Sequence, residues 1–230
     1  MVRTVCFDLD GTLFDDRQYT RAGLESAAAE LVARTGVDLT EEFIEAYFTD
    51  GHREATFDVV LSAAGLADDH VPALVRAYHD SEGPLVPYPD ATETLATLGE
   101  RYDIGVVTGG TNGRGKLSRL GLDDYVDELI VTAEREDSKR DPDPFVELAD
   151  RFDVPHESVV VVGDRPGLDF PQPNRLGMTT VRLRRGHYAT ATARGDAVPD
   201  VGVDSLTAVR EVVERVDAGS AHTAGCNRVE

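Results

Sequence analysis

The chain has 230 residues, of which 41% are hydrophobic, and it carries 43 acidic against 23 basic residues, a formal net charge of −20. The acidic balance argues against a nucleic-acid partner, because phosphate backbones are bound by basic faces. No apolar run approaches the roughly 18 residues of a membrane span, and no basic segment followed by an apolar stretch opens the chain. We therefore expect a cytoplasmic protein, with one α/β domain and an insertion or two small domains, that binds neither membrane nor nucleic acid.

Lysine is nearly absent from the sequence. Only Lys116 and Lys139 are lysines, so almost all of the positive charge is arginine. An acidic surface repels itself at low ionic strength and is screened at high salt. We interpret the composition as halophilic, an adaptation to a salt-rich cytoplasm, with an ordinary acidic protein as the alternative. The two cysteines, Cys6 and Cys226, suggest neither a disulfide framework nor a metal site.

The stretch Thr4–Leu13 joins a short apolar run to two aspartates that are one residue apart. The run has the β-branched and aromatic composition of a buried parallel strand. Asp8 and Asp10 then follow at its carboxyl end, where open α/β sheets bind ligands, and both point to the same side. Because two close carboxylates repel unless a cation or a shared proton neutralises them, we interpret the pair as chemical. The alternative is a loop cap in which Gly11 supplies the turn.

The next part of the chain, from Phe14 to Ser81, contains no strand pattern. Apolar residues at helical spacing, together with start and stop signals, predict four helices there. A proline-punctuated connector follows at 83–89. We therefore expect a helical cap, residues 14–83, inserted after the first strand. Its predicted helices span about residues 19–34, 40–48, 54–64 and 71–79, with a break at 50–53.

From Asp90, which we expect to cap a helix, helical and strand patterns alternate. Such alternation indicates parallel strands joined by right-handed crossovers. The predicted fold is α/β, a doubly wound Rossmann-like core of residues 1–13 and 84–216, with a disordered tail at 217–230. The basic run 182–187 is expected to be an edge strand with charged outward residues. Predicted strands lie at 104–107, 129–131, 158–162 and 179–183, and predicted helices at 90–99, 112–120, 142–152, 173–176 and 205–216.

Three of the strands end in polar residues suited to phosphate and metal. In a parallel sheet such ends share one edge, so we expect the motifs to meet in one crevice. They are Asp8 with Asp10, Thr108 with Gly109 and Gly110, and Asp164 followed by Asp169.

In this order the motifs resemble those of the haloacid dehalogenase superfamily of phosphohydrolases. The family's first motif, Asp-x-Asp-Gly-Thr, is matched at Asp8–Thr12, and the second, a Thr or Ser after a strand, at Thr108. Its third, Lys-Pro-Asp-Pro-x-x-Phe, resembles Lys139–Phe145, and its fourth, Gly-Asp followed by a second Asp, is matched at 163–164 and Asp169. The resemblance covers about residues 1–216 and is to the branch with a helical cap, similar to phosphoglycolate phosphatases.

Two positions depart from the family pattern. Gly109 stands where this branch commonly has Asn, although backbone N–H groups of a Gly-Gly loop can still hold phosphate. Arg140 stands where the third motif has proline. A rival register would put Asp141 in the place of the motif lysine. We prefer Lys139, because that register also aligns the aspartate, proline and phenylalanine that follow it.

The resemblance implies a role for each motif residue. Asp8 would be the nucleophile that forms an aspartyl-phosphate, and Asp10 would protonate the leaving oxygen and then deprotonate water. The Mg²⁺ ion would be held by the Asp8 side chain, the Asp10 backbone carbonyl and Asp164, with Asp169 helping directly or through water.

The remaining two motifs would contact the phosphoryl group. Thr108 and the N–H groups of the loop at Gly109 would bind phosphoryl oxygens, and Lys139 would offset the charge on Asp8 and on the phosphoryl group. Plainer interpretations stay open: Thr108 as a helix cap, Lys139 as a solvated loop lysine and Asp164 as a strand-end cap.

The activity that the resemblance implies is Mg²⁺-dependent hydrolysis of a small phosphorylated metabolite. Alternatives on the same fold are a haloacid dehalogenase, against which Asp10 argues because a halide needs no proton, a phosphomutase, and a non-catalytic binding or regulatory protein. The oligomeric state is not predicted. We expect the cap to set substrate choice, and its candidate residues are Arg17, Tyr19, Arg21, Tyr47, His52 and Arg53, of which His52 and Arg53 lie in a break between helices.

Overall fold

The structure is a computed structural model and describes residues 1–219. The chain divides into two compact units, which we name the core unit (Met1–Asp15 with Val86–Glu230) and the helical unit (Asp16–Leu85). Their boundaries lie slightly later than the predicted 14 and 83. That the units act as a catalytic core and a cap remains a prediction. Within residues 1–219, no helix combines the length and the apolar character needed to cross a membrane.

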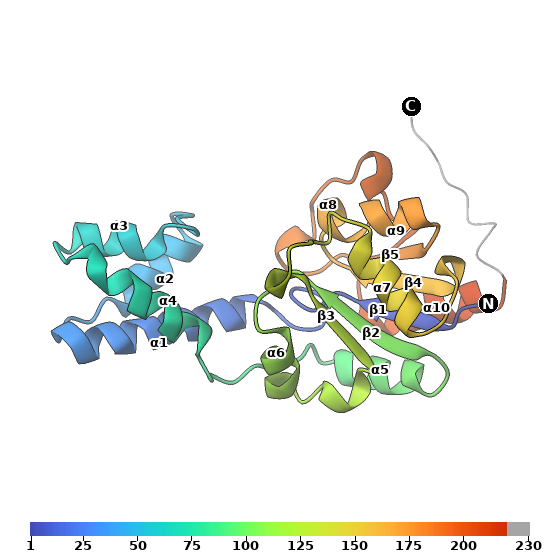
Figure 1. The fold of residues 1–230 in the computed structure, drawn as a ribbon, viewed down its shortest axis with the longest axis horizontal. Helices are drawn as coiled ribbons and strands as arrows, with labels where there is room; N and C mark the ends of the chain where they lie inside the picture. The colour runs from blue at the N-terminus through green and yellow to red at the C-terminus, as the bar shows by residue number, and fades with distance from the viewer. Residues whose placement is uncertain (220–230) are drawn as a thin grey trace. The chain divides into compact units, whose positions relative to one another are not determined.

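The core unit contains a six-stranded sheet in which every pair of neighbouring strands is parallel (Figure 1). The strand order is β3-β2-β1-β4-β5-β6, so the chain builds outward from β1 on one side and then on the other. This is a doubly wound α/β sheet, and the predicted fold class is confirmed. The strands are β1 (Thr4–Phe7), β2 (Asp103–Thr108), β3 (Glu128–Val131), β4 (Val159–Gly163), β5 (Thr179–Leu183) and β6 (Val201–Val203).

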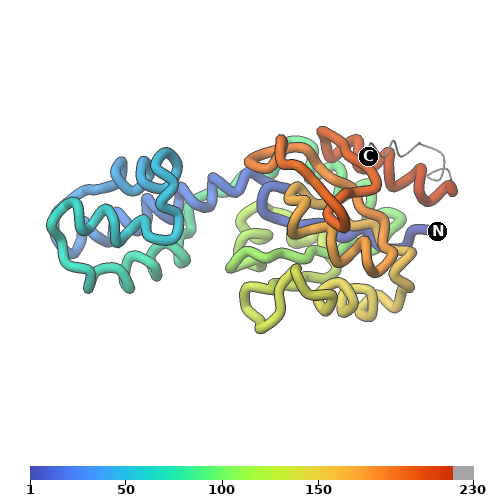
Figure 2. Tube along the Cα trace, turned by 90° about the horizontal axis from the view of Figure 1, so that it is seen from above, coloured from blue at the N-terminus to red at the C-terminus, as the bar shows by residue number. Residues whose placement is uncertain are grey.

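Helices cover both faces of this sheet, and Figure 2 shows α7 and α10 on opposite sides of it. On one face, Phe145 and Leu148 of α7 pack against buried residues of the central strands, including Cys6 and Val161. The helices are α5 (Ala91–Gly99), α6 (Gly113–Leu120), α7 (Asp143–Arg151), α8 (Pro166–Asp169), α9 (Pro171–Leu176) and α10 (Leu206–Asp217). Single 3₁₀ turns lie at Asp123–Tyr125, Thr132–Glu134, His156–Ser158, Gly186–Tyr188 and Gly195–Ala197.

The end of the chain differs from expectation in two ways. The sheet has a sixth strand, β6, which the sequence did not reveal because three residues are too few for an alternation pattern. The edge-strand prediction for 182–187 is therefore wrong: β5 lies between β4 and β6. Arg182 is buried, and its Nη2 donates hydrogen bonds to the carbonyls of Tyr188, Ala189 and Ala191. Of the predicted disordered tail, Asp217 ends α10, and residues 220–230 lie outside the described part.

Asp90 differs from its predicted role as a helix cap. It stands before α5, but its side chain makes no capping hydrogen bond there. The carboxylate instead accepts two hydrogen bonds from the Arg185 guanidinium, at 2.9 and 2.8 Å, and one from the Leu206 N–H at 2.8 Å. The hydrogen bonds from Arg185 hold the pKa of Asp90 below its ordinary value, although partial burial opposes this shift. The side chain thus joins three segments of the core unit that are far apart in sequence.

The helical unit packs four helices around an apolar centre. Gly23 of α1 allows a close approach, because a Cβ there would lie 2.5 Å from the Tyr78 ring. Phe43 is fully buried and meets Phe57 edge to face, with ring centroids 5.1 Å apart. The helices are α1 (Arg17–Thr35), α2 (Thr40–Phe48), α3 (Thr56–Ala63) and α4 (Val71–His79), with a 3₁₀ turn at Asp68–His70.

Candidate active site

The three motif-bearing strands are neighbours in the sheet. β1 lies between β2 and β4, and the chain changes its direction of winding at β1. Ligands of open α/β sheets bind outside the carboxyl ends of the strands at such a point. The ladder continues one residue past β1, where the Asp8 N–H donates to the Val162 carbonyl at 2.8 Å. This bond places the first motif aspartate at the carboxyl edge of the sheet.

Asp8 is buried, with 8% of its surface exposed, and both of its carboxylate oxygens have partners. Oδ1 forms an ion pair with the Lys139 ammonium, and Oδ2 accepts a hydrogen bond from the Thr12 hydroxyl at 3.1 Å. The same hydroxyl lies 3.4 Å from Asp164 Oδ1. Gly11 makes the turn between Asp8 and Thr12 with φ = 86°, and a Cβ there would lie 2.6 Å from Asp164 Oδ2. In the Gly-Thr pair of the motif, the glycine therefore allows a turn that a side chain would block, and the threonine hydroxyl lies between the two aspartates.

Lys139 lies in the loop before α7 and is 2% exposed. Its ammonium bridges Asp8 and Asp169, with 2.9 Å to Asp169 Oδ1. Asp141 instead closes the loop, because its carboxylate accepts hydrogen bonds from the N–H and the hydroxyl of Ser138 at 2.9 and 3.1 Å. Arg140 is exposed. The structure therefore places Lys139, and not Asp141, beside the first motif, and the departure at Arg140 lies at the surface.

The fourth motif supplies two carboxylates that are each 2% exposed. Asp164 follows β4 directly, and Asp169 ends the one-turn helix α8. The Asp169 Oδ2 atom accepts a hydrogen bond from the Arg165 N–H at 2.8 Å. Gly163 makes room for this arrangement, because a Cβ there would lie 2.5 Å from Asp169 Oδ2. A glycine is thus required before Asp164 for a steric reason, in addition to its place in the motif.

Asp10 lies beside the second motif. Its Oδ2 accepts a hydrogen bond from the Thr108 hydroxyl at 3.0 Å, and its Oδ1 pairs with the Lys116 ammonium at 2.6 Å. Lys116, on α6, is only 3% exposed. We did not assign it a role from the sequence, although the scarcity of lysine was a signal that could have found it. Gly109 is exposed, and a Cβ there would meet its nearest neighbours at 3.9 Å or more, so the absence of Asn is not imposed by lack of space.

Burial is the largest single influence on the pKa values of the titratable groups in the cluster. Burial raises the pKa of Asp8 to about 7; the Lys139 ammonium opposes this rise, and the charges of Asp169 and Asp10 add to it. Burial lowers the pKa of Lys139, but the negative charges of Asp169 and Asp8 outweigh it and the pKa lies above its ordinary value. Burial also raises the pKa of Cys6, to about 12, so this neighbouring thiol stays protonated.

The acidic residues fit a hard divalent cation. One carboxylate oxygen each from Asp8, Asp164 and Asp169 lies within 4.8 Å of the other two, and all three residues are buried. Oxygen donors of this kind, with some ligand positions left to water, are what Mg²⁺ binds. The cation would also neutralise the repulsion from Asp169 and Asp10, which adds to the effect of burial on the Asp8 pKa.

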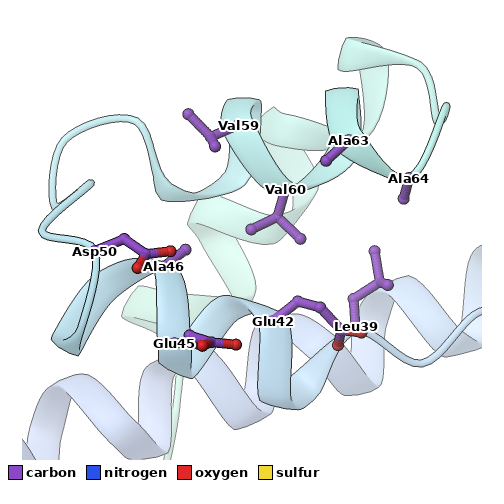
Figure 3. A pocket seen from close by; sticks show the side chains of 9 residues that line it. All are labelled: Leu39, Glu42, Glu45, Ala46, Asp50, Val59, Val60, Ala63 and Ala64. Carbon is purple, nitrogen blue, oxygen red and sulfur yellow. The ribbon is translucent and has the colours of Figure 1, made fainter.

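The predicted specificity residues belong to the helical unit. Arg53 lies over the Tyr47 ring at 6.0 Å, and Arg17 lies over the Phe48 ring at 5.3 Å. Figure 3 shows a pocket of the same unit, which has apolar side chains from α3 on one side and acidic side chains from α2 on the other. Its acidic residues make it a poor site for a phosphate anion. They are Glu42, Glu45 and Asp50.

Two protein-family models match the chain. A family model described as haloacid dehalogenase-like hydrolase matches residues 2–172, and a second hydrolase-like model of the same kind matches residues 138–209. The chain therefore belongs to the haloacid dehalogenase-like hydrolases and is an enzyme of the hydrolase class.

Its similarity to particular proteins covers nearly the whole chain. It is 34% identical to a glyceraldehyde 3-phosphate phosphatase of Methanopyrus kandleri, over 94% of this chain and 99% of the relative. It is 30% identical to a ribulose-1,5-bisphosphate 5-phosphatase of Halopiger xanaduensis, over 93% of this chain and 100% of the relative.

Solved structures with the same fold include a 2-haloacid dehalogenase of Pseudomonas syringae, with a TM-score of 0.68 and 24% identity over 94% of this chain and 100% of that one. They also include the magnesium-bound hydrolase YfnB of Bacillus subtilis, with a TM-score of 0.67 and 18% identity over 92% and 98% of the two chains. At these identities the structures show the fold alone.

Proposed function

We propose that this hydrolase is a Mg²⁺-dependent phosphatase that releases inorganic phosphate from a small phosphorylated metabolite through an aspartyl-phosphate. The observation that carries the proposal is the buried cluster of Asp8, Lys139, Asp164 and Asp169, with Asp10 next to it, at one edge of the sheet. The two relatives named above, both phosphatases of small phosphorylated sugars, support the same class of substrate.

In the first step the Asp8 carboxylate attacks phosphorus, and the bond between phosphorus and the leaving oxygen breaks. Asp10 donates a proton to that oxygen, which leaves as an alcohol. Lys139 lies against Asp8 and offsets negative charge where it accumulates on the carboxylate and the phosphoryl oxygens. Bound at Asp8, Asp164 and Asp169, Mg²⁺ would supply positive charge to the phosphoryl oxygens.

In the second step Asp10 takes a proton from a water molecule, whose oxygen attacks phosphorus. The bond between phosphorus and Asp8 breaks, which frees phosphate and restores the carboxylate. Both steps use Asp10 as the proton carrier, once as an acid and once as a base. The alkoxide formed from a phosphate monoester needs that proton, whereas a departing halide does not. The held position of Asp10 beside Asp8 therefore supports phosphatase over dehalogenase chemistry.

The test is phosphate release from a panel containing glyceraldehyde 3-phosphate, ribulose 1,5-bisphosphate, phosphoglycolate and p-nitrophenyl phosphate. It is run in molar KCl with Mg²⁺ and, separately, with EDTA. We expect release from at least one sugar phosphate with Mg²⁺ and none with EDTA. Halide release from 2-chloropropionate without metal would instead indicate a dehalogenase. An isomeric phosphate ester formed without free phosphate would indicate a mutase. A folded protein with none of these activities would overturn the proposal.

A further inference from the structure

The only two lysines of this strongly acidic chain are both buried at the candidate site. They form ion pairs with different aspartates: Lys139 pairs with Asp8 and Asp169, and Lys116 pairs with Asp10. Removing an ammonium from water costs several kcal/mol unless a partner compensates. The molecule buries Lys116 in spite of this cost, at a position that none of the four family motifs includes. This costly burial beside Asp10 indicates that Lys116 has a role that involves Asp10.

Local structure brings Lys116 to Asp10 through glycines. Helix α6 begins at Gly113, where a Cβ would lie 2.7 Å from Val131 Cγ2 and 3.0 Å from Thr108 Cγ2, so the helix approaches the ends of β2 and β3 closely. Gly110 leaves open the space between the two partners. A Cβ at this position would lie 2.2 Å from Asp10 Oδ2 and 2.7 Å from Lys116 Nζ. The glycine-rich segment is thus shaped around this ion pair.

The Asp10 carboxylate is held at both oxygens by the same loop and helix. Lys116 donates to Oδ1 at 2.6 Å, and Thr108 donates to Oδ2 at 3.0 Å. The Thr108 hydroxyl is itself fixed, because it accepts a hydrogen bond from the Gly110 N–H at 3.1 Å. A carboxylate with one partner can turn about its side-chain bonds, whereas two partners define its plane. The side chain keeps 21% exposure, which leaves a path to substrate.

We propose that Lys116 is a positioning residue that fixes the Asp10 carboxylate for proton transfer to the leaving oxygen. The inference rests on the proposed phosphatase function. A proton carrier must lie within hydrogen-bond reach of the atom that receives the proton, and small displacements lower the rate of transfer. A Lys116 that acts through Asp10 matters most when the leaving oxygen needs a proton. A Lys116 that instead binds the phosphoryl group directly matters equally for every leaving group.

The test compares kcat/KM for two substrates. The leaving group of glyceraldehyde 3-phosphate is a strongly basic alkoxide, which needs a proton. The leaving group of p-nitrophenyl phosphate is the weakly basic nitrophenolate, which departs without protonation. We expect Lys116→Met to lower kcat/KM for glyceraldehyde 3-phosphate by about 10- to 100-fold and for p-nitrophenyl phosphate by less than about 3-fold. In the Asp10→Asn background, Lys116→Met should cause no further selective loss, because the group that it positions is gone.

Control variants separate this role from a structural one. Arg114→Met removes an exposed positive charge from the same helix and should leave both kcat/KM values unchanged. Gly110→Ala places a Cβ against Asp10 Oδ2 and the Lys116 ammonium, so it displaces the Asp10 carboxylate with both side chains present. It should therefore reproduce the alcohol-selective loss even if Lys116→Met fails to fold. Thermal melting establishes that each variant is folded.

Equal losses for the two substrates, or a Lys116→Met loss that persists undiminished in the Asp10→Asn background, would overturn the inference and assign Lys116 to phosphoryl binding. A wild-type protein that releases no phosphate from either substrate would count against the proposed function itself.

Discussion

The core unit and the helical unit bury different kinds of side chain. At the sheet edge, the core unit buries three aspartates and two lysines; Lys139 pairs with Asp8 and Asp169, and Lys116 pairs with Asp10. In the helical unit, by contrast, no charged side chain of residues 16–85 is buried, and the interior is aliphatic and aromatic. Apolar burial stabilises a fold directly, whereas buried charges stabilise it weakly and cost much when one partner is removed. The charged cluster is therefore best explained by chemistry, and the apolar centre by stability.

The largest effect on activity is expected from substitution of Asp8, a buried charged residue of the core unit. Asp8→Asn removes the nucleophile, and we expect phosphate release to fall by roughly 10⁴-fold or more. The protein should remain folded, because the amide keeps the volume of the side chain and Asp169 still pairs with the Lys139 ammonium. Phosphate release and circular dichroism measure the two outcomes. Asp124→Asn, an exposed change of the same chemistry, should leave the rate unchanged. A variant with wild-type turnover would contradict the assigned role of Asp8.

The converse change is Phe43→Ala, in the centre of the helical unit. Phe43 is fully buried, so its removal should destabilise the unit by about 3–5 kcal/mol through lost apolar contact and the cavity left behind. Hydrogen exchange should show the loss of protection within Asp16–Leu85. Val59→Ala, at a position that is 38% exposed, should change protection by less than about 0.5 kcal/mol. Similar effects of the two variants would argue against a packed centre.

A third expectation concerns pH and metal. Without metal, the pKa of Asp8 is about 7, above its ordinary value of 3.8, so the folded state holds this proton more tightly than the unfolded state does. The stabilisation is complete below about pH 4 and is lost as the pH rises through 7. Melting temperature should therefore fall by a few degrees between pH 5 and 8.

Added Mg²⁺ should remove much of this decline, because it favours the ionised carboxylate. Asp8→Asn should show a flatter profile than the wild type. An equally steep profile in the variant would mean that another group is responsible for the decline.

The smallest effect on stability is expected from the loss of an exposed ion pair. Arg151 is 41% exposed and pairs with Glu128 and Glu147 at 2.6 Å. Arg151→Ala should destabilise the protein by at most about 1 kcal/mol at low salt. In molar KCl the difference should vanish, because exposed pairs are screened. Denaturant unfolding at both salt concentrations measures it. If the acidic surface is a halophilic adaptation, as we propose, the wild type itself should be more stable in the high salt.

Sequence reasoning succeeded where a residue type and its spacing determine position. Asp8 and Asp10 follow a strand whose composition marks it as buried, and the Gly-Asp of the fourth motif follows another, so the parallel sheet brings them to one edge. It failed where position depends on contacts that are distant in sequence. Lys116 reaches Asp10 only through the packing of α6, and Asp90 binds Arg185 and Leu206 instead of capping its own helix. Three-residue β6 offered no pattern to detect.

The burial of Lys116 and Lys139 also determines how the protein can be labelled. An amine-reactive dye or crosslinker attacks uncharged, accessible amines, and both lysine ammonium groups are ion-paired and almost inaccessible. The sequence has no other lysine, so no lysine side chain of the folded protein is available to such a reagent. Reaction at either lysine would therefore report that the charged cluster has opened.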